Sequence, residues 1–392
     1  MKIAHIADPH LGIRQFHRQT PGGINQREAD VAASFKAAID GVIAARPDAV
    51  VVAGDLFHSV RPTNAAIVFA FRQFQRLRDA LPDAPVILIA GNHDTPRSAE
   101  TGSILGLFSE LGVDVAATES RRLSYPALGL SVLAVPHAAL TAGERPSLRP
   151  EGPERHQVLV IHGEVEGVLP GERAALEYGG ALITPGELDA ASWSYVAFGH
   201  YHVRHELAPR AWYAGALDYV SPNLWGELHD EASRQITGKS WLLADLETGR
   251  VVAQPVAPVR RVLDLTPIRG EGLGASELDA LIAARVAAVE GGIADHVIRL
   301  VVHDVPRHVM RELDHTAIRA LKAEALHFHL DVRRPEIHRE TGVGAPGQRQ
   351  TLPEMVRAYL SHRALPAIVD RERFVAVGTE LVEAAEREPA AG

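Results

Sequence analysis

Five short apolar runs, each leading into acidic, amide or imidazole side chains, constrain the fold of this chain more than any other feature. The runs are Ile3–Asp8, Ala49–Asp55, Pro85–Asn92, Gln157–His162 and Tyr195–His200. Their length and their content of Val and Ile are typical of strands that are buried on both faces. Because ligands of α/β sheets gather where the strands end, residues far apart in sequence can share one site there.

Helical stretches separate these runs. Ala32–Ala45 has apolar residues at four-residue spacing, and Asn64–Leu81 carries an apolar face with Ile67, Phe71 and Phe74. Strands that alternate with helices predict a layered α/β fold.

The polar residues at the ends of the runs are metal-ligand types. They are Asp8, His10, Asp55, Asn92, His162, His200 and His202. Mixed carboxylate, imidazole and amide donors suit Mn, Fe or Zn better than Ca or an all-oxygen Mg site. On an extended backbone, the spacing of two puts Asp8 and His10 on one side, and likewise His200 and His202. Each histidine alone could be a surface or packing residue, so the prediction depends on all five segments together.

Two metal ions about 3.5–4 Å apart can share one carboxylate and clamp both oxygens of a phosphoryl transfer. Asp55 is the expected bridge, because a carboxylate has two oxygens. One metal would take Asp8, His10, Asp55 and His202, and the other would take Asp55, Asn92, His162 and His200. His93 is assigned as the acid that stabilises or protonates the leaving oxygen, with Asp94 as the candidate residue that orients it.

The pattern changes after a first region, residues 1–255. A linker rich in Pro and Arg precedes residues 260–335, which predict a small α+β domain with the order strand–helix–strand–helix–strand. A break rich in Gly and Pro, Gly342–Gly347, comes before a helical segment at 350–388. Its apolar spacing predicts helices over Pro353–His362 and Arg371–Arg387.

Composition excludes several classes of protein. The absence of cysteine excludes disulfides and thiolate metal sites, and no apolar run reaches the length of about 18 residues that a membrane span needs. The N-terminus reaches Asp8 too soon for a signal peptide, so we expect a cytoplasmic protein with no membrane partner. The net charge of −9 argues against a purely electrostatic nucleic-acid binder.

The five segments have the form DxH, GD, GNHD, H and GHxH, and they resemble the calcineurin-like metallophosphoesterase superfamily. Within it, the GDLFH segment at 54–58, followed by Arg61-Pro62, is similar to that of the SbcD/Mre-type DNA repair exonucleases. The resemblance implies metal roles for the seven residues above, a catalytic histidine at His93 and a second active-site histidine at His58. The stretch Ile13–Asn25 departs from the family pattern, since it is longer than the family's loop there.

The resemblance further implies manganese as the metal and DNA as the substrate, cut as an exonuclease on duplex ends and as an endonuclease on single strands or hairpins. It implies an SMC-like ATPase of the SbcC type as partner, with a DNA-capping role for 260–335. The C-terminal helices would grip that ATPase, or they fold back on their own domain. It also implies a homodimer through Asn64–Leu81 and Arg97–Leu111. The candidate dimer contacts are Ile67, Phe71, Leu105 and Phe108, which could instead pack on their own sheet.

The rival function is a dinuclear-metal phosphodiesterase or phosphatase that acts on small or protein phosphate substrates. The GDLFH segment and the long extension beyond residue 255 favour the nuclease. A binding protein with a vestigial site would lack a ligand, and none of the seven is missing.

Overall fold

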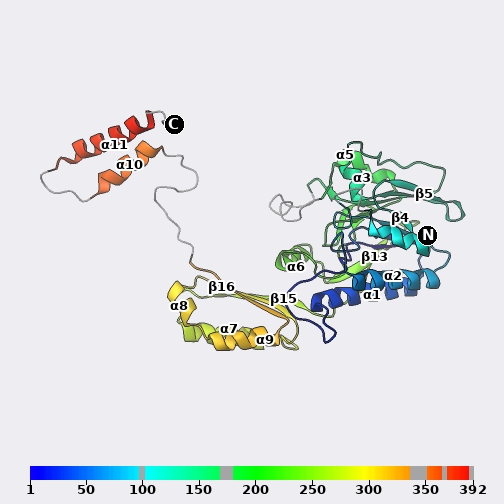
Figure 1. The fold of residues 1–392 in the computed structure, drawn as a ribbon, viewed down its shortest axis with the longest axis horizontal. Coiled ribbons are helices and arrows are strands. Elements are labelled where there is room, and N and C mark those ends of the chain that lie inside the picture. Colours follow the sequence, from blue (N-terminus) through cyan, green and yellow to red (C-terminus); the bar gives the residue numbers. More distant parts are fainter. Residues whose placement is uncertain (97–101, 168–179, 336–350, 364–368, 388–392) are drawn as a thin grey trace.

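The computed structural model describes residues 1–96, 102–167, 180–335, 351–363 and 369–387. Two six-stranded sheets pack face to face, with helices on their outer sides (Figure 1). The first sheet runs β14-β13-β1-β2-β3-β4, made of Val251–Val256, Lys239–Asp245, Lys2–Ile6, Ala49–Ala53, Val86–Ile89 and Asp114–Ala116. The second runs β11-β12-β10-β7-β6-β5, made of His205–Ala208, Ala211–Tyr213, Tyr195–Gly199, His156–His162, Leu130–Val135 and Arg121–Tyr125. The predicted layered α/β fold is therefore confirmed, and the five predicted strands divide between the two sheets of a sandwich.

Successive side chains of a strand point to opposite faces, and both faces of these strands are covered, which explains why the runs are apolar throughout. In β2, Val50 and Val52 pack beneath the helices α1 (Gln26–Ala45) and α2 (Asn64–Ala80), next to Phe35 and Phe74. Val51, which points the other way, lies in the core between the two sheets. A strand covered on both faces needs no polar side, so its sequence shows no alternation.

N-terminal caps fix the residues at which α1 and α2 begin. The side chain of Asn25 accepts the N–H groups of Arg27 and Glu28, and α1 therefore begins at Gln26, six residues before the predicted start at Ala32. The predicted start was wrong because the first turn of α1 carries polar residues that are buried by long-range contacts. Thr63 caps α2 in the same way, and α2 begins at the predicted residue Asn64.

The candidate dimer contacts differ in their exposure. Leu105 and Phe108 lie on the short helix η2 (Ile104–Leu111) and are fully buried in the core beneath α2. Ile67 and Phe71 are partly buried against the same core. The prediction that Leu105 and Phe108 face a partner was therefore wrong, since they pack inside their own chain. Residues 97–101 of the predicted helix Arg97–Leu111 lie outside the described residues.

A smaller unit follows the sandwich. Its sheet is β15 (Val262–Arg269), β16 (Val297–His303) and β17 (His327–Val332), with all strands parallel. The helices α7 (Ala275–Ala287), α8 (Arg307–Glu312) and α9 (His315–Glu324) cover one face and close a separate hydrophobic core. The strand–helix order matches the prediction, with α8 as an addition. The boundaries 1–255, 260–335 and 350–388 remain a proposal, which this separate core supports.

Several contacts join the sandwich to the smaller unit. In the long loop Ile13–Asn25, the ring of Phe16 stacks on His327 with 4.1 Å between centroids, and Arg18 donates to the carbonyl oxygen of Ala323 at 2.6 Å. The linker residue Arg260 donates from Nε to Asp30 of α1 at 3.0 Å. The helix α6 (Leu224–Ser233) also lies between the two parts in Figure 1.

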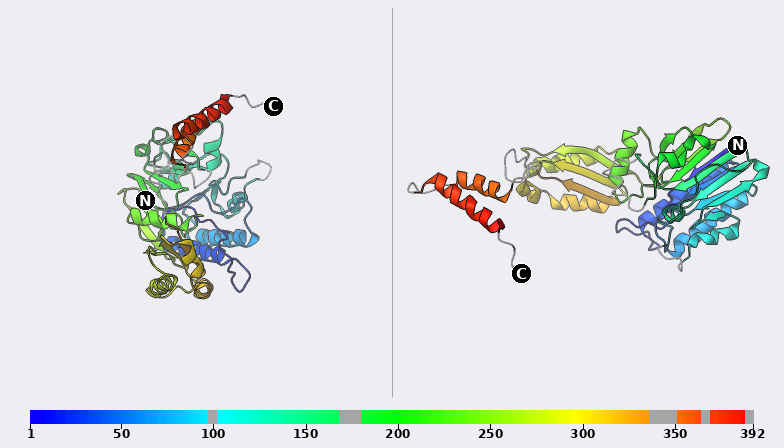
Figure 2. Two further views of the ribbon diagram at one scale, coloured as in Figure 1. Left: turned by 90° about the vertical axis from the view of Figure 1, so that its left-hand side faces the viewer. Right: turned by 90° about the horizontal axis from the view of Figure 1, so that it is seen from above.

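The C-terminal segment is a pair of helices, α10 (Leu352–His362) and α11 (Arg371–Arg387), as predicted. They pack on each other closely at Gly378, where an added Cβ would overlap Leu360. Both views of Figure 2 show the pair apart from the β15–β17 sheet, rather than folded back on it. The predicted break Gly342–Gly347 lies outside the described residues. Among the helices that are described, none combines the length and apolar character needed to cross a membrane.

A buried ion pair makes a testable contribution to stability. Arg27 is fully buried and donates to Asp218 at 2.7 Å. Replacing Arg27 with Met leaves this carboxylate buried without its partner, so we expect a loss of about 3–5 kcal/mol in the free energy of unfolding. Urea unfolding followed by tryptophan fluorescence measures it. The control is Arg76→Met at the exposed Arg76–Asp40 pair, which should cost less than about 1 kcal/mol. Equal losses would contradict the assignment.

Candidate metal centre

All seven predicted ligands lie at one edge of the sandwich. Asp8 and His10 follow β1, Asp55 follows β2, and Asn92 follows β3 in the first sheet. His162 ends β7, and His200 and His202 follow β10 in the second sheet. The strands β1, β2 and β3 are parallel to one another, as are β7 and β10. Their carboxyl ends therefore meet, and six of the seven side chains are buried there.

Two groups of donor atoms share one residue. Asp8, His10 and Asp55 hold ligand atoms within 4.8 Å of one another, and so do Asp55, His162 and His200. The Oδ2 atom of Asp55 lies 3.6 Å from Nε2 of His10 and 3.5 Å from Nε2 of His162. Asp55 thus faces both groups, as predicted, but through one oxygen. Its other oxygen, Oδ1, accepts the backbone N–H of His93 at 2.8 Å.

The remaining two predicted ligands complete the groups. Oδ1 of Asn92 lies 2.9 Å from Nε2 of His162 and 3.1 Å from Nδ1 of His200. Nε2 of His202 lies 3.1 Å from Nε2 of His10. The structure therefore brings all seven residues together at this edge, and their division between two metal positions stays a prediction.

The hydrogen bonds around these rings fit the binding of cations. Nδ1 of His162 lies 2.9 Å from the carbonyl oxygen of Ala53, which can only accept, so His162 donates there. The Nε2 atom of His162 faces the oxygens of Asn92 and Asp55, so these three atoms stay close together only when a proton or a cation lies among them. A divalent cation can take that place, and the donor set suits Mn, Fe or Zn.

Protonation of the site follows the same logic. Burial lowers the pKa of His10 and His202 well below the ordinary value and that of His200 to about 3, which leaves neutral rings able to bind metal. Although burial opposes it, the carboxylates of Asp55 and Asp8 raise the pKa of His162 to about 9. Burial also raises the pKa of Asp8 to about 8. Bound cations would displace these protons, since metals bind the deprotonated forms.

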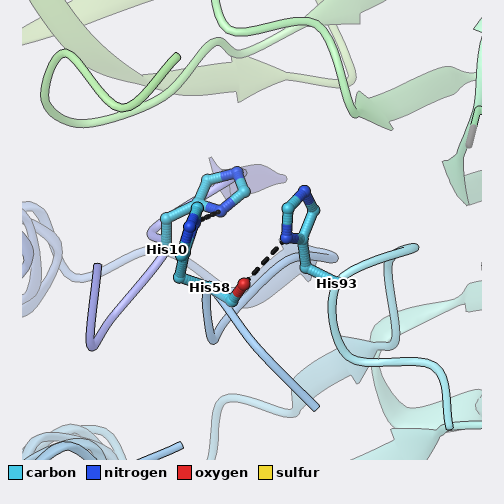
Figure 3. A group of neighbouring side chains, drawn as sticks. All are labelled: His10, His58 and His93. Atoms are coloured by element: carbon cyan, nitrogen blue, oxygen red, sulfur yellow. Dashed lines mark hydrogen bonds between the residues drawn. The ribbon is translucent and has the colours of Figure 1, made fainter. Parts of the chain in front are cut away.

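His93 and His58 lie beside the first group of donors (Figure 3). Nδ1 of His93 donates to the backbone carbonyl of His58 at 2.8 Å, and the two rings stack with 5.1 Å between centroids. Nδ1 of His58 lies 3.3 Å from Nδ1 of His10. The second ring nitrogen of His93 points away from the His58 carbonyl, so it is available to a substrate.

Asp94 contacts backbone groups and not the ring of His93. Its buried carboxylate accepts the backbone N–H groups of Leu56 at 3.0 Å, Phe57 at 2.9 Å and Gly91 at 3.2 Å. These bonds tie the loop after Asp55 to the loop that carries Asn92. Among the described contacts, the group that orients the ring of His93 is the His58 carbonyl, and the prediction that Asp94 orients it was wrong.

The backbone that carries the ligands is strained. Asp8, His10, Asp55 and His200 have positive φ angles of 50°, 48°, 50° and 102°. The prediction that the backbone is extended from Asp8 to His10 and from His200 to His202 was therefore wrong. The chain turns after β1 and after β10, and it leaves the strand conformation there. Such positive-φ residues persist only where surrounding contacts hold them, and they are common at functional sites.

Sequence reasoning missed His137. It follows β6, the neighbour of β7, and its backbone N–H donates to the carbonyl of Ala90 at 3.0 Å, two residues before Asn92. Its side chain is only 9% exposed, and Nδ1 has no hydrogen-bond partner among the described residues. The signal was present, because Leu130–Val135 is a sixth apolar run that leads into a Pro-His pair.

Comparison with known proteins accords with this geometry. Residues 1–204 match the family model described as calcineurin-like phosphoesterase, which is more than half of the chain. The chain belongs to the calcineurin-like phosphoesterase family. In this calcineurin-like phosphoesterase, the matched range contains all seven donor residues, His58 and His93.

Curated relatives carry the name DNA double-strand break repair protein Mre11. The chain is 29% identical to that of Saccharolobus solfataricus over 212 residues, which cover 53% of this chain and 51% of the relative. The chain is 31% identical to the protein of Sulfurisphaera tokodaii over 208 residues, which cover 52% of this chain and 49% of the relative. For that of Methanococcus maripaludis the identity is 39% over 111 residues, covering 28% of each. The matched part thus spans about half, or less, of the length of these relatives.

The glycine before Asn92 allows a close approach that can be tested. A Cβ on Gly91 would overlap the carboxylate and backbone of Asp55, whereas a Cβ on Gly106 of η2 would meet open space. We expect Gly91→Ala to lower the free energy of unfolding by about 1–3 kcal/mol or more, since a packed site resists added volume. Gly106→Ala is the matched control and should leave it nearly unchanged. Thermal unfolding of both variants measures the difference, and a tolerated Gly91→Ala would show that the loop is not tightly packed.

Proposed function

We propose that this chain is a two-metal DNA phosphodiesterase that acts in the repair of DNA breaks. The observation that carries the proposal is the pair of donor sets that share Oδ2 of Asp55, with the ring of His93 beside them. Similarity to proteins named Mre11 supports DNA as the substrate. We propose both activities, exonuclease on duplex ends and endonuclease on single strands or hairpins.

The donor sets suggest how two manganese ions would be held. Asp8, His10, Asp55 and His202 would hold the first, and Asp55, Asn92, His162 and His200 would hold the second. When bound, the two cations would activate a water molecule for attack and offset the charge of the phosphate. Asp55 is the residue whose loss would disturb both positions, because it belongs to both sets.

His93 is proposed as the acid for the leaving oxygen. Its Nδ1 proton is committed to the His58 carbonyl, so the outward nitrogen is the atom that can hold a proton for the substrate. His58 is proposed to keep that ring in place through its carbonyl and its stacked imidazole, and to contact the scissile phosphate. Asp94 is proposed to act indirectly, through the three backbone groups that it binds.

Two kinds of partner are proposed. The first is an SMC-like ATPase of the SbcC type, bound by the α10–α11 pair. Tyr359, Val377 and Leu381 are 62%, 47% and 67% exposed, and they leave an apolar face on helices that pack mainly on each other. Apolar faces of helices commonly bind grooves or coiled coils of other proteins. The second is another copy of this chain, contacted through α2 and η2, where Val68 and Leu107 are exposed.

A phosphodiesterase or phosphatase for small or protein phosphate substrates is the second candidate. The observation that favours it is that three arginines of the smaller unit and its linker are paired with carboxylates. Arg260 pairs with Asp30, Arg299 with Asp264, and Arg333 with Asp331. Paired guanidinium groups contribute less to phosphate binding, and the whole chain has a net charge of −9. If the chain is the nuclease nonetheless, the proposed ATPase partner would have to supply part of the affinity for DNA.

Cleavage assays separate the two candidates. We expect labelled duplex and hairpin DNA to be cut in Mn²⁺ and left intact with chelator, with Mg²⁺ run for comparison. His93→Ala should lower the rate by about 10²–10⁴-fold, the usual contribution of a general acid, and still bind metal. His308→Ala, an exposed histidine of α8, is the matched control and should cut at the wild-type rate.

Bis-p-nitrophenyl phosphate is assayed in parallel. Hydrolysis of this diester with DNA left intact, even after the SMC-like ATPase is added, would contradict the nuclease and favour the small-substrate enzyme. If His93→Ala cut DNA at the wild-type rate, only the proposed role of His93 would be contradicted, and the proposed nuclease activity would stand.

The partner face is tested by a charge substitution. Leu381→Asp places a carboxylate on the apolar face of α11, so we expect binding to the SMC-like ATPase to weaken by about 10-fold or more, equivalent to at least 1.4 kcal/mol. Leu281→Asp on α7, where Leu281 is 42% exposed, is the matched control. Isothermal titration measures both, and equal affinities for the two variants would exclude α11 from the interface.

A further inference from the structure

A buried ionic cluster lies behind the ligand His202. Lys239 of β13 is 3% exposed, and it pairs with Glu231 of α6 at 2.7 Å and with Glu227 of the same helix. Both glutamates are buried as well, at 4% and 5% exposure for Glu227 and Glu231. A buried ionic cluster of this kind stabilises a fold little compared with apolar packing, so its position invites a functional explanation.

The cluster reaches His202 by two routes. Oε2 of Glu227 accepts the backbone N–H of Ser221 at 3.3 Å, and Oγ of Ser221 lies 2.8 Å from Nδ1 of His202. Nζ of Lys239 donates to the backbone carbonyl of His202 at 3.4 Å. The ring and the main chain of one ligand are therefore both held by the same buried charges.

When Nδ1 of His202 donates to the hydroxyl oxygen of Ser221, the lone pair of the neutral ring lies on Nε2, the nitrogen that can bind a metal. With Nδ1 engaged by the hydroxyl, Nε2 is the atom that faces Nε2 of His10, 3.1 Å away. Partners of this kind fix the tautomer and the direction of a metal-binding imidazole, and their loss weakens metal binding. Nδ1 of His162 instead has a carbonyl partner in β2, a strand of the facing sheet, so the two metal positions depend on different supports.

The helix that carries the glutamates also contacts the smaller unit. Trp225 and Leu228 of α6 join a cluster with Val262, Val297 and Leu326 of that unit. The guanidinium of Arg299 lies 4.9 Å from the centroid of the Trp225 ring. Leu228 and Glu231 are three residues apart and therefore neighbours on the surface of α6, so the apolar contact with the smaller unit lies next to the buried ionic cluster. The same short helix thus holds Lys239 behind His202 and packs on β15 and β16.

We propose that Ser221 is a positioning residue for His202, held by the Glu227–Lys239 pair, and that the seating of α6 on the smaller unit sets how tightly the first metal position binds its ion. The proposal rests on the two-metal function proposed above. It assigns to the smaller unit an influence on one metal position and leaves the other, built from Asn92, His162 and His200, independent.

Manganese binding to the full chain tests the proposal without any use of activity. Isothermal titration with Mn²⁺ should give two positions in the wild type. Ser221→Ala should weaken one of them by about 10–100-fold, the usual effect of removing a partner of a ligand, and leave the other unchanged. Ser221→Thr keeps the hydroxyl and should restore most of the lost affinity.

Two further variants identify the weakened position. Asn92→Ala removes a donor of the second position, so Ser221→Ala combined with Asn92→Ala should retain no tight position. Trp225→Ala lies outside both donor sets and should weaken the same position as Ser221→Ala, by a smaller factor. Ser34→Ala is the matched control, because Ser34 is also buried and donates to Asp218 at 2.7 Å. It should keep both wild-type affinities.

Each outcome has one meaning. Two wild-type affinities in folded Ser221→Ala would overturn the positioning role, as would an equal loss in Ser34→Ala. Wild-type affinities in Trp225→Ala would overturn the dependence on α6. A wild-type chain that binds no Mn²⁺ would instead overturn the two-metal function itself.

Discussion

The crowding of buried acceptor atoms around Asp55 is the constraint on which the rest of this structure depends. The carboxylates of Asp8 and Asp55 and the ring nitrogens of several imidazoles lie close together in one buried place. Burial and mutual repulsion raise the pKa of Asp8 to about 8, while the same carboxylates raise that of His162 to about 9. The chain thus keeps an arrangement that is unfavourable without positive charge, which is what a site for cations requires.

Holding this arrangement takes support from both sheets. His5 crosses the interior of the sandwich, with its ring nitrogens 2.9 Å from the hydroxyl of Tyr195 and 3.1 Å from the carbonyl of Phe198. Burial lowers its pKa to about 3, so it joins the sheets as a neutral group. Asp94 then ties together the loops after β2 and β3. These contacts hold the positive φ angles of the ligand residues, which no isolated turn would keep.

Polar links also run from the sandwich toward the smaller unit. Asp218 binds Arg27, Arg27 contacts Asp30, and Asp30 binds Arg260 of the linker. The α6 helix makes a second path, from His202 through Ser221 to the apolar cluster at β15 and β16. A substrate that contacts both units would therefore act on elements that also support the ligands. In calcineurin-like phosphoesterases with an added domain, such links are one physical route by which that domain could tune the metal site.

The sequence by itself determined the strands and the donor-type side chains that follow them, because apolar runs and ligand chemistry are local properties. It also indicated both C-terminal helices, whose apolar spacing lies within each helix. Tertiary structure decided that Leu105 and Phe108 face inward, and that Asp94 binds backbone groups rather than the ring of His93. It also decided that one oxygen of Asp55 faces both sets, and that Ser221 holds His202. These facts depend on contacts between segments distant in sequence, and on φ angles that such contacts impose, so no local pattern could carry them.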